Sequence, residues 1–390
     1  MKRNAAMVAS ELQQLQQHQL QRQRRTVLGF AAAGTASRPV LGGRPMHDFC
    51  SNDYLGLARE PLVVRAMQEA AAAWGAGAGA SHLVTGHSAE HQALEQELAA
   101  FTGREAALLF STGYMANVGV ITALASRGEI IVQDRLNHAS LIDGARQSGA
   151  RLQRYRHADA ADASRLFAAA TGATLLATDG VFSMDGDVAP LAELAALAAR
   201  HEAWLLVDDA HGLGVLGATG RGTLELTGLG AAEVPLLVGT LGKAFGCFGA
   251  FVAGDRDVIE LILQRARSYI YTTAMPPAVA AAARAALALS QQQAWRRERL
   301  TAAVARFRRA AAERGIRLLP SATPIQPVLV PGAANCLAAS SALLQRGFWV
   351  AAIRSPTVPA GTERLRITLS ASHEDAHIDA LLDALAEVLA

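Results

Sequence analysis

Lysine is rare in this sequence of 390 residues, and one lysine lies in a setting that suits covalent chemistry. Among 36 basic side chains, only Lys2 and Lys243 are lysines, and the others are arginines. Lys243 lies in the string TLGKAFG, between glycines and apolar residues. A lysine amine can lose its proton and attack a carbonyl carbon, whereas an arginine stays protonated. Lys243 is therefore a candidate nucleophile, and an ordinary surface lysine is the competing interpretation.

Asp208 and His211 follow the apolar run WLLV in the string WLLVDDAHG. A carboxylate at the end of a buried strand needs a charged partner, and a protonated pyridine nitrogen would be one for Asp208. A protonated ring of this kind accepts electrons from a carbon next to its imine. The two side chains are alternatively a pair of metal ligands, but the sequence offers no third ligand cluster beside them, and we expect no metal.

Five further residues follow other short apolar runs. A strand that leads into a helix presents backbone amides that bind phosphate, a histidine can stack on a ring or move a proton, and hydroxyls can donate hydrogen bonds. Each residue alone is equally explained as part of an ordinary turn. Together they indicate a site where one phosphorylated cofactor touches the ends of successive strands. The five residues are Gly113, Tyr114, His138, Ser183 and Thr240.

The β-rich runs that precede these residues alternate with helical patterns. This alternation predicts an α/β fold with a mainly parallel sheet covered by helices. Ligands on such sheets gather where the strands end, which is where the candidate residues lie. The runs occupy residues 107–110, 129–134, 174–182, 204–212, 236–243 and 249–254.

Both ends of the chain differ from this middle part. Residues 11–25 have the pattern of a polar helix, and the prolines Pro276 and Pro277 open an alanine-rich helix that we expect to leave the sheet domain. Strands and helices after Gln326 predict a compact α/β lobe. We therefore divide the chain into an N-terminal helical segment (1–45), a large α/β domain (46–285) and a small C-terminal α/β domain (286–390).

Composition excludes several classes of protein. The net charge of +2 predicts no nucleic-acid partner and no attraction to anionic membranes. The chain has no run of about 18 apolar residues and no secretory signal, and its three cysteines form no C-x-x-C pair, so we expect a cytoplasmic protein. The glycine run WGAGAGASHL follows a helical pattern instead of a strand, which leaves a nicotinamide-dependent oxidoreductase as a remote alternative.

Several blocks resemble one family of pyridoxal-phosphate (PLP) enzymes. The chain is similar to the α-oxoamine synthases, a branch of the fold-type-I PLP enzymes that joins an amino acid to an acyl-CoA with loss of carbon dioxide. The resemblance implies PLP as cofactor and a mainly parallel, seven-stranded sheet domain. It extends from about Arg22 to the C-terminus in the family order: SNDYLGLA (51–58), FSTGY (110–114), DRLNHASL (134–141), VFSMDGD (181–187), VDDAHGLGVLG (207–217), TLGKAFG (240–246), YTTAMPP (271–277) and IRSPTVPAGTERLR (353–366).

The resemblance also implies which residues act on the cofactor. Lys243 would bind PLP as a Schiff base and later move protons at the substrate carbon. Asp208 would pair with the pyridine nitrogen, His211 would hydrogen-bond the phenolic oxygen, and His138 would stack on the ring. Further cofactor contacts would come from Gly113, Tyr114, Ser183 and Thr240.

Substrate contacts follow from the same resemblance. Arg354 would clamp the amino-acid carboxylate, a role that suits the two-pronged guanidinium group. Thr357, Asn52 and an N-terminal arginine would also contact substrate. Arg22 is the best match for that arginine, and Arg24 is close enough to remain an alternative.

Block 353–366 indicates a particular branch of the family. It resembles members that condense L-alanine with pimeloyl-CoA, or with the pimeloyl carrier-protein thioester, in biotin biosynthesis. The lysine motif is shared across the family, so a sister enzyme that uses glycine or serine with another acyl-CoA is the alternative. A non-catalytic relative is not favoured, because no expected active-site position is substituted. Members form homodimers with shared active sites, and YTTA (271–274) resembles the segment that reaches across.

Overall fold

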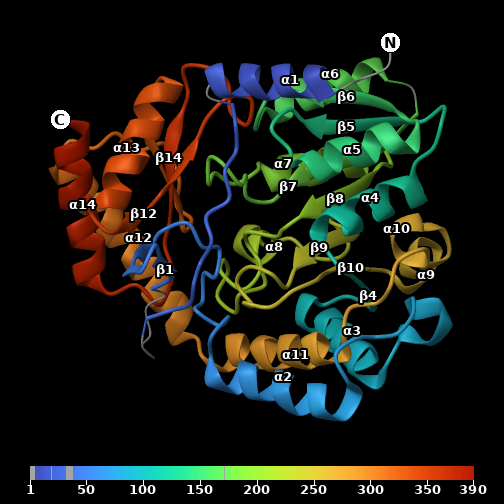
Figure 1. Cartoon of the computed structure of the whole chain (residues 1–390). Helices are drawn as coiled ribbons and strands as arrows, with labels where there is room; N and C mark the ends of the chain where they lie inside the picture. Colours follow the sequence, from blue (N-terminus) through green and yellow to red (C-terminus); the bar gives the residue numbers. More distant parts are fainter. Residues whose placement is uncertain (1–4, 19, 32–37, 171) are drawn as a thin grey trace. The chain divides into compact units, whose positions relative to one another are not determined.

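The computed structural model describes residues 5–18, 20–31, 38–170 and 172–390 (Figure 1). The chain divides into two compact units, one of residues 52–301 and the other of residues 1–51 together with 302–390. The second unit therefore groups both ends of the chain. Our three-part division at residues 45 and 285 stays a prediction about which parts fold independently.

The larger unit is built on a seven-stranded sheet, which confirms the predicted sheet. Its strand order is β4-β10-β9-β8-β7-β5-β6. Neighbours from β9 to β6 pair in parallel, whereas β10 is antiparallel to both β4 and β9. The strands are β4 (Ala106–Phe110), β5 (Ile130–Asp134), β6 (Arg151–Tyr155), β7 (Ala173–Asp179), β8 (Trp204–Asp208), β9 (Leu236–Thr240) and β10 (Ala250–Gly254).

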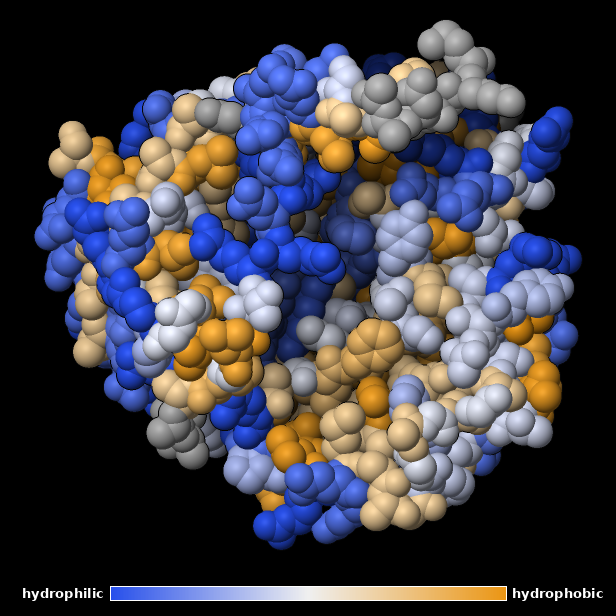
Figure 2. All heavy atoms as spheres, viewed as in Figure 1, coloured by the Kyte–Doolittle hydropathy of each residue, from blue (hydrophilic) through white to orange (hydrophobic). Residues whose placement is uncertain are grey.

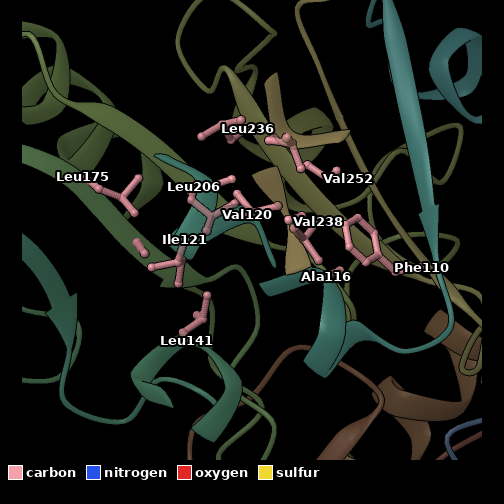
Figure 3. Close-up of a cluster of buried hydrophobic side chains, with 14 of the residues drawn as sticks. Phe110, Ala116, Val120, Ile121, Leu141, Leu175, Leu206, Leu236, Val238 and Val252 are labelled. Carbon is pink, nitrogen blue, oxygen red and sulfur yellow. The ribbon is translucent and has the colours of Figure 1, made fainter. Parts of the chain in front are cut away.

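Helices separate these strands in sequence, as the alternating pattern predicted, except that β9 and β10 are joined by the turn that carries Lys243. Helix α4 is apolar on nearly all sides, and this is typical of a helix buried in the core of a large domain. Figure 3 shows Val120 and Ile121 of α4 among strand residues such as Leu206 and Val238. The helices are α2 (Pro61–Trp74), η1 (His82–Gly86), α3 (Ala89–Thr102), α4 (Gly113–Leu124), α5 (Ala139–Ser148), α6 (Ala160–Ala169), α7 (Leu191–Arg200), α8 (Thr223–Thr227), α9 (Arg256–Arg265), α10 (Arg267–Ile270) and α11 (Pro277–Gln292).

Helix α11 begins at the proline pair, as the sequence predicted, but it does not leave the sheet domain. It packs against α2 and α3 within the larger unit. Its alanines are largely buried, because small side chains allow close approach between helices. The expected departure of the chain at this helix is therefore wrong, and α12 (Trp295–Glu313) carries the chain onward into the other unit.

The smaller unit contains the α/β lobe expected near the C-terminus. Its central sheet has the order β11-β14-β13 and is antiparallel, and a short parallel pair joins β12 to β3. The elements are β1 (Val40–Leu41), β2 (Arg44–Pro45), β3 (His47–Asp48), β11 (Ile325–Leu329), α13 (Ala333–Gln345), β12 (Phe348–Trp349), β13 (Ala351–Ile353), β14 (Arg364–Thr368) and α14 (Asp375–Leu389).

The N-terminal helix is shifted from its expected range of 11–25. Helix α1 spans Ala5–Gln17, and the described residues after it are not helical up to β1. The amides of Leu20 and Gln21 donate to the Leu15 carbonyl and close the last turn. Arg22 is therefore presented on extended chain instead of a helix.

Surface composition gives two further observations. On the face drawn in Figure 2, hydrophilic and hydrophobic residues are interspersed. Among the helices of the described ranges, none is long and apolar enough to cross a membrane.

Candidate active site

The candidate cofactor residues of the larger unit lie just beyond the carboxyl ends of sheet strands. His211 follows β8, which ends at Asp208, and Lys243 follows β9, which ends at Thr240. Strands β8 and β9 are parallel neighbours, so the turns after them emerge at the same edge of the sheet. The fold thus brings together side chains that are far apart in sequence.

Lys243 lies at one end of a chain of hydrogen bonds. Its Nζ is 2.9 Å from Nε2 of His211, and Nδ1 of His211 is 2.6 Å from the Tyr54 hydroxyl. That hydroxyl lies 3.3 Å from Oδ1 of Asn52. His211 and Tyr54 are buried. The histidine ring is therefore fixed at both nitrogens, with one of them facing the lysine amine.

The turn that carries Lys243 is held against another segment of the same unit. The Gly246 amide donates to the Lys243 carbonyl, and Gly246 has a φ of 65°. A Cβ at Gly246 would lie 2.2 Å from the Ala58 amide nitrogen. Because that neighbour is backbone, only glycine fits, and block 51–58 supports the lysine turn directly.

Asp208 belongs to a second, separate chain of hydrogen bonds. Its Oδ2 accepts from Nδ2 of Asn117 at 2.6 Å, and its Oδ1 accepts from the Ala210 amide at 3.0 Å. Nδ2 of Asn117 also donates to the Ser140 hydroxyl, which is 2.7 Å from Nδ1 of His138. Asp208 is 6% exposed, and within the described ranges no arginine or lysine forms an ion pair with it. The carboxylate is thus buried with neutral donors only.

Burial shifts the proton equilibria around Asp208. It lowers the pKa of His138, so this ring is neutral at pH 7. Burial, and next the charge of Asp208, raise the pKa of Asp179 well above its usual range, and the Asp179 carboxyl accepts the His138 amide at 2.6 Å. Burial likewise raises the pKa of Asp209 to about 7. Both shifts favour the protonated acids and so reduce the negative charge next to Asp208.

Three of the four remaining cofactor candidates also lie where a strand of this sheet ends. Gly113 begins α4, whose first-turn amides have no partners within the helix, and Thr112 caps this end by accepting from the Met115 amide at 3.2 Å. The Thr240 hydroxyl donates to the Gly249 carbonyl and accepts from the Gly242 amide. Ser183 is half-buried in the turn after β7.

Tyr114 is the candidate whose surroundings differ most from expectation. It is 43% exposed, and its hydroxyl donates to Asp143 at 2.7 Å. This hydrogen bond raises the pKa of Tyr114. The contact holds the side chain toward α5, which carries Asp143.

The candidate substrate residues of the smaller unit line a single groove of about 630 Å³. Arg22, Arg354 and Thr357 all contribute to it, whereas Arg24 is not among its lining residues. A guanidinium nitrogen of Arg354 donates to the Gln21 carbonyl at 2.9 Å, which ties the arginine to the N-terminal segment. The structure thus places Arg22 beside Arg354.

Sequence reasoning missed three polar residues of the two hydrogen-bond chains around Lys243 and Asp208: Tyr54, Asn117 and Ser140. Asn117 is fully buried in an apolar helix, and an asparagine among apolar helix residues is a signal that the sequence offered. Tyr54 and Ser140 fall inside recognised blocks but gave no signal of their own. Tyr54 pairs with His211, and Ser140 pairs with Asn117, residues far away in sequence, so only the fold reveals these contacts.

A cluster of three histidines, His82, His87 and His91, lies outside this network. Nδ1 of His82 is 3.0 Å from Nδ1 of His87. The ring of His91 accepts the Ser88 amide at Nδ1 and lies 2.7 Å from the Met275 carbonyl at Nε2. Because both nitrogens of His91 are engaged, the cluster is explained by hydrogen bonding and offers two ligands for a metal, not three.

The residues of the larger unit fit PLP on structural grounds. A buried carboxylate with only neutral donors suits a cationic ring nitrogen, and Oδ1 of the neighbouring Asn117 is buried without a hydrogen-bond partner in the described structure. A lysine amine beside a fixed imidazole suits the cofactor aldehyde, and a helix N-terminus suits its phosphate. Together with the mainly parallel sheet, these features define a fold-type-I PLP-dependent enzyme.

Comparison with known proteins narrows this class. Residues 44–385 match the model of the aminotransferase class I and II family. The chain is 61% identical to the 8-amino-7-oxononanoate synthase of Methylococcus capsulatus over 88% of this chain and 89% of that protein. The chain belongs to this family of 8-amino-7-oxononanoate synthases, within the aminotransferase class I and II proteins.

Solved structures agree with this assignment. A serine palmitoyltransferase variant from S. paucimobilis, with a bound PLP–myriocin aldimine, is 31% identical with a TM-score of 0.93, covering 99% of this chain and 98% of that one. The 8-amino-7-oxononanoate synthase of Francisella tularensis is 30% identical with a TM-score of 0.77, covering 88% of this chain and 98% of that one. The predicted fold class and PLP dependence are confirmed.

Proposed function

We propose that this enzyme condenses L-alanine with pimeloyl-CoA, or with the pimeloyl carrier-protein thioester, to give 8-amino-7-oxononanoate and carbon dioxide in biotin biosynthesis. The observation that carries the proposal is the 61% identity to a relative named for this product, over 88% of the chain. A sister activity with serine has one observation in its favour, which is the high structural similarity to serine palmitoyltransferase at 31% identity. The two are distinguished by the choice of amino acid.

Bound PLP supplies an electron sink that stabilises negative charge at the carbon next to the substrate amine. The residues proposed to hold it are Lys243 at its aldehyde, Asp208 at its ring nitrogen and His138 on its ring face. His211 would donate to its phenolic oxygen. The further contacts proposed are Gly113, Tyr114, Ser183 and Thr240.

Lys243 would have a second task as a base and an acid. Its amine would remove the proton from the alanine Cα and would later return a proton to the product carbon. The amine must be neutral to act as a base, and the positive charge of a protonated cofactor ring favours that neutral form. His211, 2.9 Å from Nζ, orients the amine without supplying a negative charge.

Arg354, Thr357, Arg22 and Asn52 are proposed to contact the substrates. Arg354 presents the two-pronged donor that suits the alanine carboxylate, and Arg22 lines the same groove. A second cation there suits the terminal carboxylate of a pimeloyl chain. Of the two arginines that the sequence offered, Arg22 lines this groove and Arg24 does not, which supports Arg22 over Arg24; Arg25 lines the groove as well.

A homodimer with shared active sites is proposed on the family resemblance. The larger unit also exposes several large apolar side chains, which a partner subunit would cover. They include Leu62, Met67, Trp74, Val84 and Tyr271, the last of these 70% exposed. We also propose that the enzyme acts in the cytoplasm, since its cysteines form no disulfide within the described residues.

A coupled assay for CoA release tests the proposed reaction. With purified holoenzyme and pimeloyl-CoA, L-alanine should support turnover, and glycine and serine should be poor replacements. Faster turnover with serine or glycine would assign the enzyme to a sister activity instead. The carrier-protein thioester should be compared in the same assay to establish the preferred acyl donor.

A further inference from the structure

His157 lies between two carboxylates at the edge of the sheet that carries the cofactor candidates. Its Nδ1 is 3.1 Å from Oδ1 of Asp134, and its Nε2 is 2.9 Å from Oδ2 of Asp187. Both ring nitrogens thus face an anion. A neutral imidazole has only one N–H to donate, so this arrangement is satisfied only by the protonated ring.

The three residues come from three different strand-end turns. Asp134 ends β5, His157 follows β6, and Asp187 lies in the turn after β7. In the sheet these strands are consecutive, in the order β7-β5-β6. The histidine side chain therefore joins the turns of three adjacent strands, and the Ala158 amide adds a hydrogen bond to the Asp134 carboxylate at 2.7 Å.

Two of those turns carry proposed cofactor contacts. The Asp134 carboxylate also accepts the Leu136 amide at 2.7 Å, two residues before His138. The Asp187 carbonyl accepts the Phe182 amide, which precedes Ser183. The link from Asp134 through His157 to Asp187 thus connects the turn of His138 with the turn of Ser183.

Neighbouring charges and hydrogen bonds keep the His157 ring protonated. Burial opposes the charged ring, but the hydrogen bonds and charges of Asp134 and Asp187 prevail and raise the pKa of His157 to about 10. Asp134 is fully buried, the His157 side chain is 25% exposed, and its ring meets the Phe182 ring edge-on at 4.4 Å. Two other titratable groups interact with Asp134, the Tyr155 phenol and the Asp179 carboxyl; burial raises the pKa of both, so the phenol stays neutral and Asp179 favours its protonated form.

We propose that His157 is a positioning residue for PLP: as a cation it fixes the turns of His138 and Ser183 relative to each other and so preorganises the cofactor site. This inference rests on the proposed roles of His138 and Ser183, but not on the identity of the substrates. His157 would thus belong to the cofactor site without touching the reacting atoms. Preorganised contacts raise affinity because less ordering is required on binding.

The test compares PLP affinity in His157→Gln with that of the wild-type protein. Gln is neutral and can donate to only one of the two carboxylates at a time. We expect the PLP dissociation constant, measured by titrating apoenzyme with PLP without substrates, to rise about tenfold, as for loss of one hydrogen bond to a charged group. His201→Gln, which changes an exposed histidine of the same unit, is the matched control and should bind like wild type.

Two further measurements separate positioning from a merely structural role. Asp187→Asn should also weaken PLP binding, and adding it to His157→Gln should cause little further loss, because both changes break the same link. As pH rises through about 10, wild-type affinity should approach that of His157→Gln, since the wild-type histidine then loses its proton.

Several results would overturn the inference. One is a PLP affinity of His157→Gln within twofold of wild type, even if the free energy of unfolding falls. Another is fully additive loss in the double variant. Because no substrate enters these titrations, failure of the alanine and pimeloyl-CoA assay would leave their outcome unaffected.

Discussion

Replacing Asn117 by alanine should weaken PLP binding, although Asn117 is not itself one of the proposed cofactor contacts. Its Nδ2 donates to Asp208 at 2.6 Å and to Ser140 at 2.9 Å, and Asn117 is fully buried. The change removes one of two donors to the carboxylate that we propose pairs with the PLP ring nitrogen. It also disconnects Asp208 from Ser140 and His138.

The magnitude follows from the burial and charge of this contact. Hydrogen bonds to charged groups contribute about 1.5–3 kcal/mol, which corresponds to about 10- to 150-fold in a dissociation constant. A water molecule that enters the space left by the amide would replace part of the lost bond. We therefore expect PLP affinity to fall about tenfold, at the lower end of this range.

Titration of apoenzyme with PLP measures this effect directly. Asn335→Ala, an exposed asparagine on α13, is the matched control and should leave affinity unchanged. Asn117→Asp keeps the shape of the side chain but places a second acid against Asp208, so its loss should exceed that of Asn117→Ala. Unchanged affinity in both Asn117 variants would refute the idea that Asp208 is held ready for a cationic ring.

Three further predictions concern covalent attachment, substrate binding and pH. Lys243→Ala should give no covalent label when borohydride is added to PLP-loaded protein and should lose turnover; wild-type turnover in that variant would remove the basis of the mechanism. Arg354→Ala should raise the KM for alanine about 10-fold or more while PLP affinity stays unchanged, with Arg346→Ala as control, because a charge-assisted contact to the carboxylate is lost. Burial raises the pKa of Glu95 to about 7, so the folded protein binds its proton more tightly than the unfolded chain and loses stability as pH rises from about 4.5 to about 7. Glu95→Gln keeps an acceptor for the Leu109 amide and should therefore gain up to about 3 kcal/mol in unfolding free energy relative to wild type between about pH 4 and about pH 8. Urea unfolding curves with the same pH dependence for both proteins would contradict this assignment.

The parts of the fold that follow a local pattern were predictable from the sequence. Apolar runs such as those ending at Phe110 and Asp208 became strands, and the turns after them carry the candidate residues. Helix α11 was predicted to begin at its proline pair, but its destination was not. Where a helix packs depends on distant partners, here α2 and α3. A local sequence pattern does not predict such partners.

The same distinction separates the site residues that were found from those that were missed. Lys243, Asp208 and His211 could be predicted from their residue type and from their position at the end of a strand. Asn117 and Tyr54 gain their importance only through contacts with Asp208 and His211, 91 and 157 residues away in sequence. Long-range hydrogen bonds of this kind depend on strand order, which the sequence alone did not determine.

Block 51–58 shows how one short segment can serve several parts of the site at once. The Asp53 carboxylate accepts the Leu57 and Ala58 amides, which folds the segment into a compact turn. That turn presents the Tyr54 hydroxyl to His211, and its backbone at Ala58 fits closely against Gly246 of the lysine turn. A larger residue at 246 would push the two turns apart and so disturb both the lysine and the histidine that faces it. The lysine motif therefore depends on this second block for its geometry, which gives a physical reason why the two motifs occur together in one chain.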